Sequence, residues 1–125
     1  RPLLIAVTQL TSTDEERMHK ELNITGKLED VVMHYAQNAA KAGLDGVVCS
    51  PLEAQQVHKH CGASFLTVTP GVRFADGEKG DQVRVTTPLQ AKTLGADYIV
   101  VGRPITQAPD PVAAYRRCVE EFVGA

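Results

Sequence analysis

Short apolar runs alternate with amphipathic stretches along the whole chain. Four runs, at about residues 3–10, 44–49, 65–69 and 96–101, have the composition of strands that are covered on both faces. Between the first two runs, residues 27–42 repeat apolar side chains at spacings of three and four, the pattern of a helix with one buried face. The alternation predicts four units, each a strand followed by a helix.

Residues that start and stop helices separate these units. After the second run, Ser50, Pro51 and Glu53 occupy the N-cap, first and third positions of a predicted helix, a strong start signal. Gly43 is predicted to end the long helix, because glycine adopts the left-handed conformation without a Cβ penalty. Further helix starts are predicted at residues 11–16, 87–88 and 110–111.

Strands that alternate with helices imply right-handed crossovers and a parallel sheet, so the expected fold class is α/β. Two architectures fit, an open doubly wound sheet or part of a (β/α)8 barrel. A whole barrel has eight such units in ~250 residues, so 125 residues with four units correspond to a half-barrel. A recurring pattern, in which Gly and then Asp precede an apolar strand at residues 42–48 and 94–100, favours the barrel. We therefore expect residues 1–125 to form a single half-barrel segment.

The composition is that of an ordinary globular domain, with 43% hydrophobic and 22% charged residues. A formal net charge of -2, without a run of one sign, argues against a nucleic-acid or membrane-surface footprint. Three cysteines, an odd number without a secretory signal, favour reduced thiols and a cytoplasmic location. Because the chain begins with Arg1 and not with Met, we expect it to be part of a longer protein.

In βα barrels, functional residues lie on the segments that follow the strands. Here the third run leads to Arg73 and a long polar stretch that contains Gln82, and the fourth leads to Gly102 and Arg103. A glycine N–H and a guanidinium fork are suited to an anion such as phosphate. The alternative is a solvated polar loop next to a structural Gly-Arg turn.

Other candidate chemistry is weaker. His58, His60 and Cys61 could suggest a metal site, but they fall at a predicted helix end, away from the carboxyl ends of the strands. The sequence has neither of the glycine-rich motifs that bind nucleotide cofactors. None of the four junctions offers a Cys/His pair or a cluster of metal ligands. The pattern therefore predicts binding groups without a catalytic centre.

Five segments extend this prediction to a family. They are residues 3–12 (LLIAVTQLTS), 43–50 (GLDGVVCS), 68–73 (VTPGVR), 80–82 (GDQ) and 97–106 (DYIVVGRPIT). Each is unspecific alone, but five in this order closely resemble the C-terminal half of bacterial orotidine 5'-phosphate decarboxylases. The resemblance covers essentially the whole chain.

The resemblance implies a (β/α)8 barrel, usually a homodimer, that converts orotidine 5'-phosphate to UMP and carbon dioxide in pyrimidine biosynthesis. It implies that no metal or organic cofactor takes part. Carried over by motif, Thr11 lies beside the pyrimidine ring. The implied 5'-phosphate ligands are Arg73, Gln82, Gly102 and Arg103, with residues 73–82 closing over the nucleotide.

One feature of the family is absent from this sequence. Its catalytic Lys/Asp network centres on an Asp-x-Lys-x-x-Asp motif in the N-terminal half, and no such motif occurs between Arg1 and Ala125. We expect no catalytic residue in this chain and no activity from it alone, with the missing half as a partner. Two further hypotheses are a non-catalytic half-barrel that self-associates and a related barrel enzyme that binds a sugar phosphate.

Overall fold

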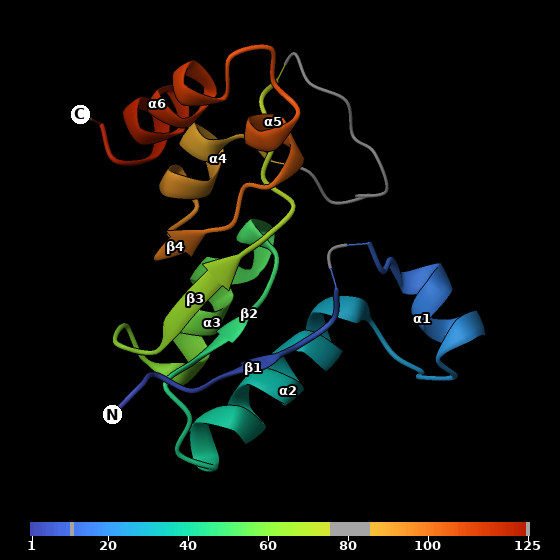
Figure 1. The fold of residues 1–125 in the computed structure, drawn as a ribbon. Helices are drawn as coiled ribbons and strands as arrows, with labels where there is room; N and C mark the ends of the chain where they lie inside the picture. The colour runs from blue at the N-terminus through green and yellow to red at the C-terminus, as the bar shows by residue number, and fades with distance from the viewer. Residues whose placement is uncertain (11, 76–85, 125) are drawn as a thin grey trace.

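One parallel sheet organises the computed structural model, which describes residues 1–10, 12–75 and 86–124. Its strands are β1 (Ile5–Val7), β2 (Gly46–Val48), β3 (Leu66–Thr69) and β4 (Tyr98–Ile99). They pair in the order β1-β2-β3-β4, so each strand lies beside its neighbour in the sequence (Figure 1). The α/β class with four parallel strands is confirmed. Each strand is shorter than the apolar run that predicted it.

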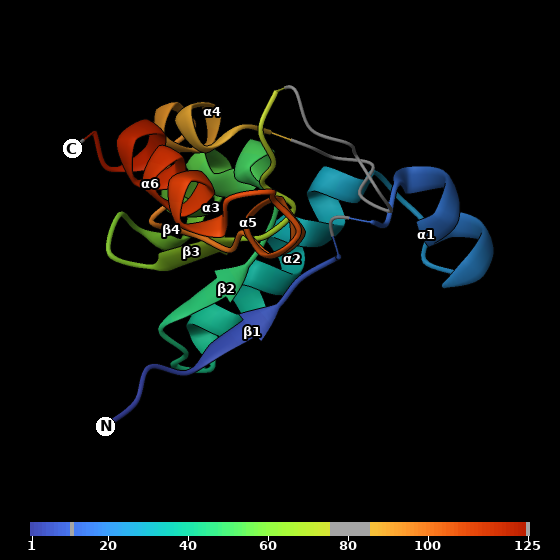
Figure 2. The same ribbon diagram turned by 45° about the horizontal axis from the view of Figure 1, so that its top comes forward.

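Helices connect the strands and form a second layer. They are α1 (Glu15–Glu21), α2 (Leu28–Lys41), the 3-10 turn η1 (Pro51–Glu53) leading into α3 (Ala54–Cys61), α4 (Pro88–Thr93), α5 (Arg103–Thr106) and α6 (Pro111–Phe122). Helix α2 packs on β1 and β2, and α3 packs on β3, whereas α4 and α5 pack against α6 (Figure 2).

Helix α5 is absent from the elements that the sequence predicts. The sequence pattern predicts no helix between the apolar run at residues 96–101 and the helix start at residues 110–111. In the structure, Gly102 is the N-cap of a four-residue helix, and Pro104 lies in its first turn, where its missing N–H costs no hydrogen bond.

The hydrophobic core lies between the sheet and helices α2 and α3. Val47 of β2 and Cys49, which directly follows β2, are fully buried and cluster with α2 and α3 side chains, including Ala36 and Val57. Phe65, just before β3, completes this cluster. Because successive strand residues point to opposite faces, the residues between these core positions face the other way.

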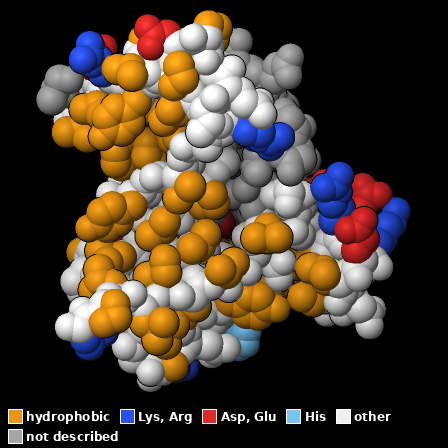
Figure 3. Space-filling model, viewed as in Figure 1, with side chains coloured by type: hydrophobic (Ala, Val, Ile, Leu, Met, Phe, Trp, Pro, Cys, Tyr) orange, Lys and Arg blue, Asp and Glu red, His pale blue; other side chains and the backbone are white. Residues whose placement is uncertain are grey.

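That other face of the sheet is apolar and exposed. Strand pairing aligns Ile5 with Gly46 and Leu66 in one row, and a second row contains Val7, Val48, Val68 and Tyr98. The side chains at the two ends of the second row, Val7 and Tyr98, are 56% and 54% exposed. Figure 3 shows hydrophobic side chains gathered over the strands on this face. Such rows correspond to the layers that fill the interior of a closed barrel.

The glycine at the start of β2 allows β2 and β3 to approach closely. A Cβ at Gly46 would lie 2.3 Å from the carbonyl oxygen of Leu66 and 2.7 Å from its Cβ. Both distances are far shorter than van der Waals contact, so only glycine fits here without a shift of the neighbouring strand.

The recurring Gly–Asp pattern has the same structural role at both of its positions. Asp45 immediately precedes β2, and its Oδ2 accepts a hydrogen bond from the backbone N–H of Leu4 at 2.8 Å. Asp97 immediately precedes β4, and its Oδ2 accepts one from the N–H of Thr67 at 2.9 Å. Each carboxylate therefore fixes the beginning of the preceding, neighbouring strand.

A basic side chain pairs with each of these carboxylates. Two guanidinium nitrogens of Arg1 donate to the two oxygens of Asp45 at 2.9 and 2.8 Å, and His58 Nε2 lies 2.7 Å from Asp97 Oδ2. The hydrogen bond from Arg1, followed by that from the Leu4 N–H, lowers the pKa of Asp45 from 3.8 to about 2. His58, which the sequence placed at a helix end, thus joins α3 to the sheet.

The lowered pKa makes Asp45 a source of acid-sensitive stability. Because the folded pKa lies below the unfolded one, the contribution is fully present above about pH 4 and is lost as the pH falls toward about 2. Urea unfolding at a series of pH values should show wild type losing more stability across this interval than Asp45→Asn, with the two curves converging at the acid end. Parallel curves would contradict this role, since other carboxyl groups titrate equally in both proteins.

Candidate functional site

The carboxyl ends of β3 and β4 bring two of the predicted binding segments to the same edge of the sheet. The two strands are parallel neighbours, with Val68 beside Tyr98 and Thr69 beside Ile99. Residues 70–75 leave this edge from β3, and Gly102 begins the segment that leaves it from β4. Both ribbon views place α5 beside the stretch that follows β3 (Figures 1 and 2).

Arg73 lies at the base of the long connection between β3 and α4. Val72 forms a parallel bridge with Thr86, and the N–H of Arg73 donates to the Thr86 carbonyl oxygen at 2.9 Å. Val72 and Thr86 are buried, and the Arg73 side chain is only 9% exposed. The stem of the connection is formed by residues 72–74 and Thr86. Backbone pairing closes the connection there, immediately beside the largely buried guanidinium group of Arg73.

Gly102 and Arg103 form the start of α5. The Gly102 carbonyl oxygen accepts hydrogen bonds from the N–H groups of Ile105 and Thr106, both at 3.0 Å. Arg103 is the first residue of the helix and is exposed. A Cβ at Gly102 would have no neighbouring atom within 4 Å, so the backbone is open on that side.

Two predicted site residues, Thr11 and Gln82, lie outside the described residues. The structure therefore brings the β3 and β4 segments, with Arg73, Gly102 and Arg103, to one edge, and the roles of Thr11 and Gln82 stay predictions. Leu10 and Thr13, which lie before and after Thr11 in the sequence, are joined by a hydrogen bond from the Thr13 N–H to the Leu10 carbonyl oxygen at 2.9 Å.

Buried polar side chains at the carboxyl ends of the strands are a feature that sequence reasoning missed. Thr8 and Gln9 follow β1, Ser50 follows β2, and Thr69 ends β3; all four are less than 9% exposed. Thr8 Oγ1 donates to the Val48 carbonyl oxygen at 2.8 Å, and Thr69 Oγ1 donates to that of Tyr98 at 3.1 Å. The available signal was the polar Thr8-Gln9 pair inside an apolar run. The four residues make this edge polar, and the two threonine hydroxyls also join adjacent strands.

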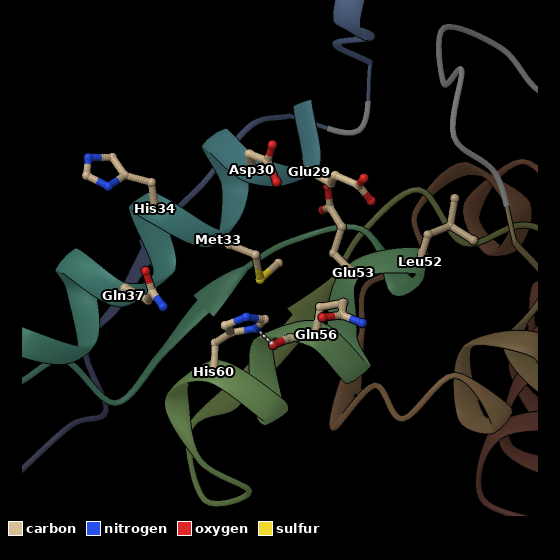
Figure 4. A pocket seen from close by; sticks show the side chains of 9 residues that line it. All are labelled: Glu29, Asp30, Met33, His34, Gln37, Leu52, Glu53, Gln56 and His60. Carbon is tan, nitrogen blue, oxygen red and sulfur yellow. Dashed lines mark hydrogen bonds between the residues drawn. The ribbon is translucent and has the colours of Figure 1, made fainter. Parts of the chain in front are cut away.

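A separate groove of about 420 Å³ lies in the helical layer (Figure 4). Its lining comes from α2, η1 and α3 and consists of Glu29, Asp30, Met33, His34, Gln37, Leu52, Glu53, Gln56 and His60. Two of its polar groups already have partners, because Glu53 accepts from the Ser50 N–H at 2.8 Å and His60 Nδ1 lies 2.8 Å from the Gln56 carbonyl oxygen. Of the predicted site residues that the structure describes, Arg73, Gly102 and Arg103, none lines it.

The titration of the thiols argues against an activated nucleophile at Cys61 or Cys118. Burial raises the pKa of both thiols, and at Cys118 the carboxylate of Glu121 raises it further while Arg117 opposes the shift. Cys49 is fully buried in the core, as expected of a small hydrophobic residue.

The part of the chain that the structure describes contains neither a metal-binding cluster nor a membrane-spanning helix. Within residues 1–10, 12–75 and 86–124, no group of three or more His, Cys, Asp or Glu side chains is arranged to hold a metal ion. No helix in these ranges has the length and apolar character required to cross a bilayer.

Comparison with known proteins identifies the family. The family model described as "Orotidine 5'-phosphate decarboxylase / HUMPS family" matches residues 1–118. The chain belongs to this family. The resemblance inferred from the five sequence segments is thereby confirmed.

Curated members of the family are closely similar to the chain. An orotidine 5'-phosphate decarboxylase of Geobacillus sp. (strain WCH70) is 60% identical over 124 residues, which are 99% of this chain and 52% of the relative. The enzyme of Lactococcus lactis subsp. cremoris (strain MG1363) is 56% identical over 122 residues, 98% of this chain and 52% of the relative. The chain therefore spans about half the length of the curated relatives it matches.

Solved structures of the family share this half. The crystal structure of orotidine 5'-phosphate decarboxylase from Lactobacillus acidophilus matches with a TM-score of 0.78 and 44% identity, covering 97% of this chain and 49% of that one. The enzyme from Pyrococcus horikoshii OT3, only 22% identical, matches with a TM-score of 0.68 over 98% of this chain and 52% of its own, which supports the fold alone. The four βα units are thus half of a barrel.

Proposed function

We propose that this chain is the C-terminal, substrate-binding half of an orotidine 5'-phosphate decarboxylase. The observation that carries the proposal is the placement of Arg73 and Arg103 on segments that follow neighbouring parallel strands. Identity of 60% to a curated enzyme of that name supports this particular reaction. The location in the cytoplasm expected from the cysteines stays a prediction.

In the proposed site, the 5'-phosphate of the nucleotide lies between the two segments. The guanidinium groups of Arg73 and Arg103 would donate charge-assisted hydrogen bonds to its oxygens, and the Gly102 N–H would add a backbone donor. Gln82 is proposed to contact the phosphate from the closing segment, and Thr11 the pyrimidine ring. Phosphate binding far from the reacting carbon supplies free energy that orients the substrate.

The chemical step is proposed to depend on residues of the other half. The reaction breaks the bond between C6 of the pyrimidine and its carboxylate carbon, and the electron pair left on C6 must be stabilised and then protonated. In the family, a lysine does this within a Lys/Asp network, and its motif does not occur in this sequence. This chain would therefore hold the substrate without converting it.

An assay of orotidine 5'-phosphate decarboxylation tests this division. The chain alone should release no detectable carbon dioxide, and activity should appear when the N-terminal half of the Geobacillus sp. relative is added. The matched control adds that half to the Arg103→Ala variant, which should recover less activity because phosphate binding is weakened. Full activity of the unmixed chain would contradict the proposal.

Ligand binding tests the phosphate site itself. Arg73→Ala and Arg103→Ala should each weaken UMP binding about tenfold or more, as expected for the loss of hydrogen bonds between charged groups. Arg116→Ala removes the same charge from the exposed surface of α6 and should leave affinity nearly unchanged. Calorimetry with ribose 5-phosphate separates a general sugar-phosphate barrel from a pyrimidine enzyme, since equal affinity for both ligands would count against the latter.

A second candidate function is that of a self-associating half-barrel, which is favoured by the exposed apolar face of the sheet. In addition, β1 and β4 each pair with a single strand among the described residues, so both edges carry unpaired backbone groups. A second copy, related by a two-fold axis along the barrel, would pair the β1 edge of one chain with the β4 edge of the other. Both apolar faces would then be enclosed.

Light scattering after size-exclusion chromatography tests this association. We expect wild type to elute at twice the chain mass, and Val7→Lys, which places a charge on the exposed face, to shift toward monomer. Val112→Lys makes the same change at a 60% exposed valine of α6 and should leave the mass unchanged. A folded wild-type monomer at high concentration would rule out self-association.

A further inference from the structure

Helix α6 contacts the stem of the connection that carries Arg73. The guanidinium carbon of Arg117 lies 4.1 Å from the centroid of the Phe74 ring. Phe74 directly follows Arg73 and is partly buried. A guanidinium group stacked at this distance over an aromatic face is attracted by the electron-rich ring.

A carboxylate on the same helix fixes the orientation of Arg117. Its Nε donates to Glu121 Oε2 at 2.9 Å, one helical turn away. The Arg117 side chain is 44% exposed and that of Glu121 is 23% exposed, so only the carboxylate side of this ion pair is shielded from solvent. This hydrogen bond limits the orientations of the Arg117 guanidinium group, so less conformational entropy is lost when the group stacks on the Phe74 ring.

The stem is thus held from two directions. On one side, Arg73 and Val72 pair with the backbone of Thr86. On the other, α6 holds Phe74 through Arg117. Helix α6 also packs against α5, whose first residue is Arg103. One helix therefore supports both segments of the proposed phosphate site.

We propose that Arg117 is a positioning residue, which sets the location of Arg73 by stacking on Phe74. The inference rests on the proposed function, because Arg73 must bind a phosphate for its position to matter. Arg117 itself acts through Phe74 and the adjacent peptide bond. With the ring held, the backbone of Arg73 has fewer conformations to lose when an anion binds, so affinity rises without a new ligand contact.

The test compares UMP affinity among variants of both partners, measured by calorimetry on the whole chain. Phe74→Leu removes the ring without a change of charge, and Arg117→Ala removes the cation. Each should weaken UMP binding about two- to fivefold, the range expected for one such contact. Phe74→Tyr and Arg117→Lys keep a ring and a cation, and they should restore most of the affinity.

Three controls separate positioning from charge and from folding. Arg116→Ala measures the effect of a lost positive charge on the neighbouring residue of α6. The double variant Phe74→Leu/Arg117→Ala should be no weaker than either single variant, because both remove one interaction. Uridine, which lacks the phosphate, should bind all variants equally, whereas general unfolding would weaken both ligands together.

The outcomes distinguish this inference from the proposed function. If wild type binds UMP better than uridine while Phe74→Leu and Arg117→Ala match Arg116→Ala, the positioning role is wrong and the phosphate site stands. Additive losses in the double variant would likewise overturn the role. If wild type does not prefer UMP over uridine, the phosphate site is wrong and the inference falls with it.

Discussion

The parallel pairing of four strands in sequence order is the constraint on which the rest of this structure depends. It requires each connection to return to the same end of the sheet, and helices such as α2 and α3 perform this return. It also places every strand's carboxyl end at one edge. Arg73 and Gly102 lie at that edge because they follow β3 and β4, although they are 29 positions apart in the sequence.

The two ends of the sheet differ in role: the amino ends carry stabilising carboxylates, and the carboxyl ends carry the segments proposed to bind substrate. At the amino ends, Asp45 and Asp97 use one carboxylate oxygen to fix a neighbouring strand, and basic side chains pair with both. At the carboxyl ends, the buried hydroxyl groups of Thr8 and Thr69 join adjacent strands, next to the segments proposed to bind phosphate. The His58–Asp97 pair shows how a cluster that resembles metal ligands in sequence can instead serve to attach a helix.

The sequence predicted those parts of the fold that depend on local chemistry. Ser50 and Glu53 form the expected capping box, with the Ser50 hydroxyl accepting from the Leu52 N–H at 3.2 Å and the Glu53 carboxylate accepting from that of Ser50. Periodicity located α2 within one residue at each end. The strand ends were less predictable, because apolar residues beyond the paired positions have the same composition as the strand itself.

The candidate site was predicted only as far as topology determines it. Barrel geometry identified the segments after β3 and β4, yet it could not reveal α5, whose four residues are too few for a periodic signal. Nor could it reveal the contact between Arg117 and Phe74, which joins residues 43 positions apart. Contacts of this kind depend on how α6 packs, and packing is not encoded in any short pattern.

Gly46 has a consequence for the shape of the sheet. It lies on the apolar exposed face, in the row between Ile5 and Leu66, where it leaves out a side chain that the backbone of β3 would otherwise strike. A sheet that lacks bulk on one side bends toward that side. Gly46 therefore favours, within these four strands themselves, the curvature that a closed ring of strands requires.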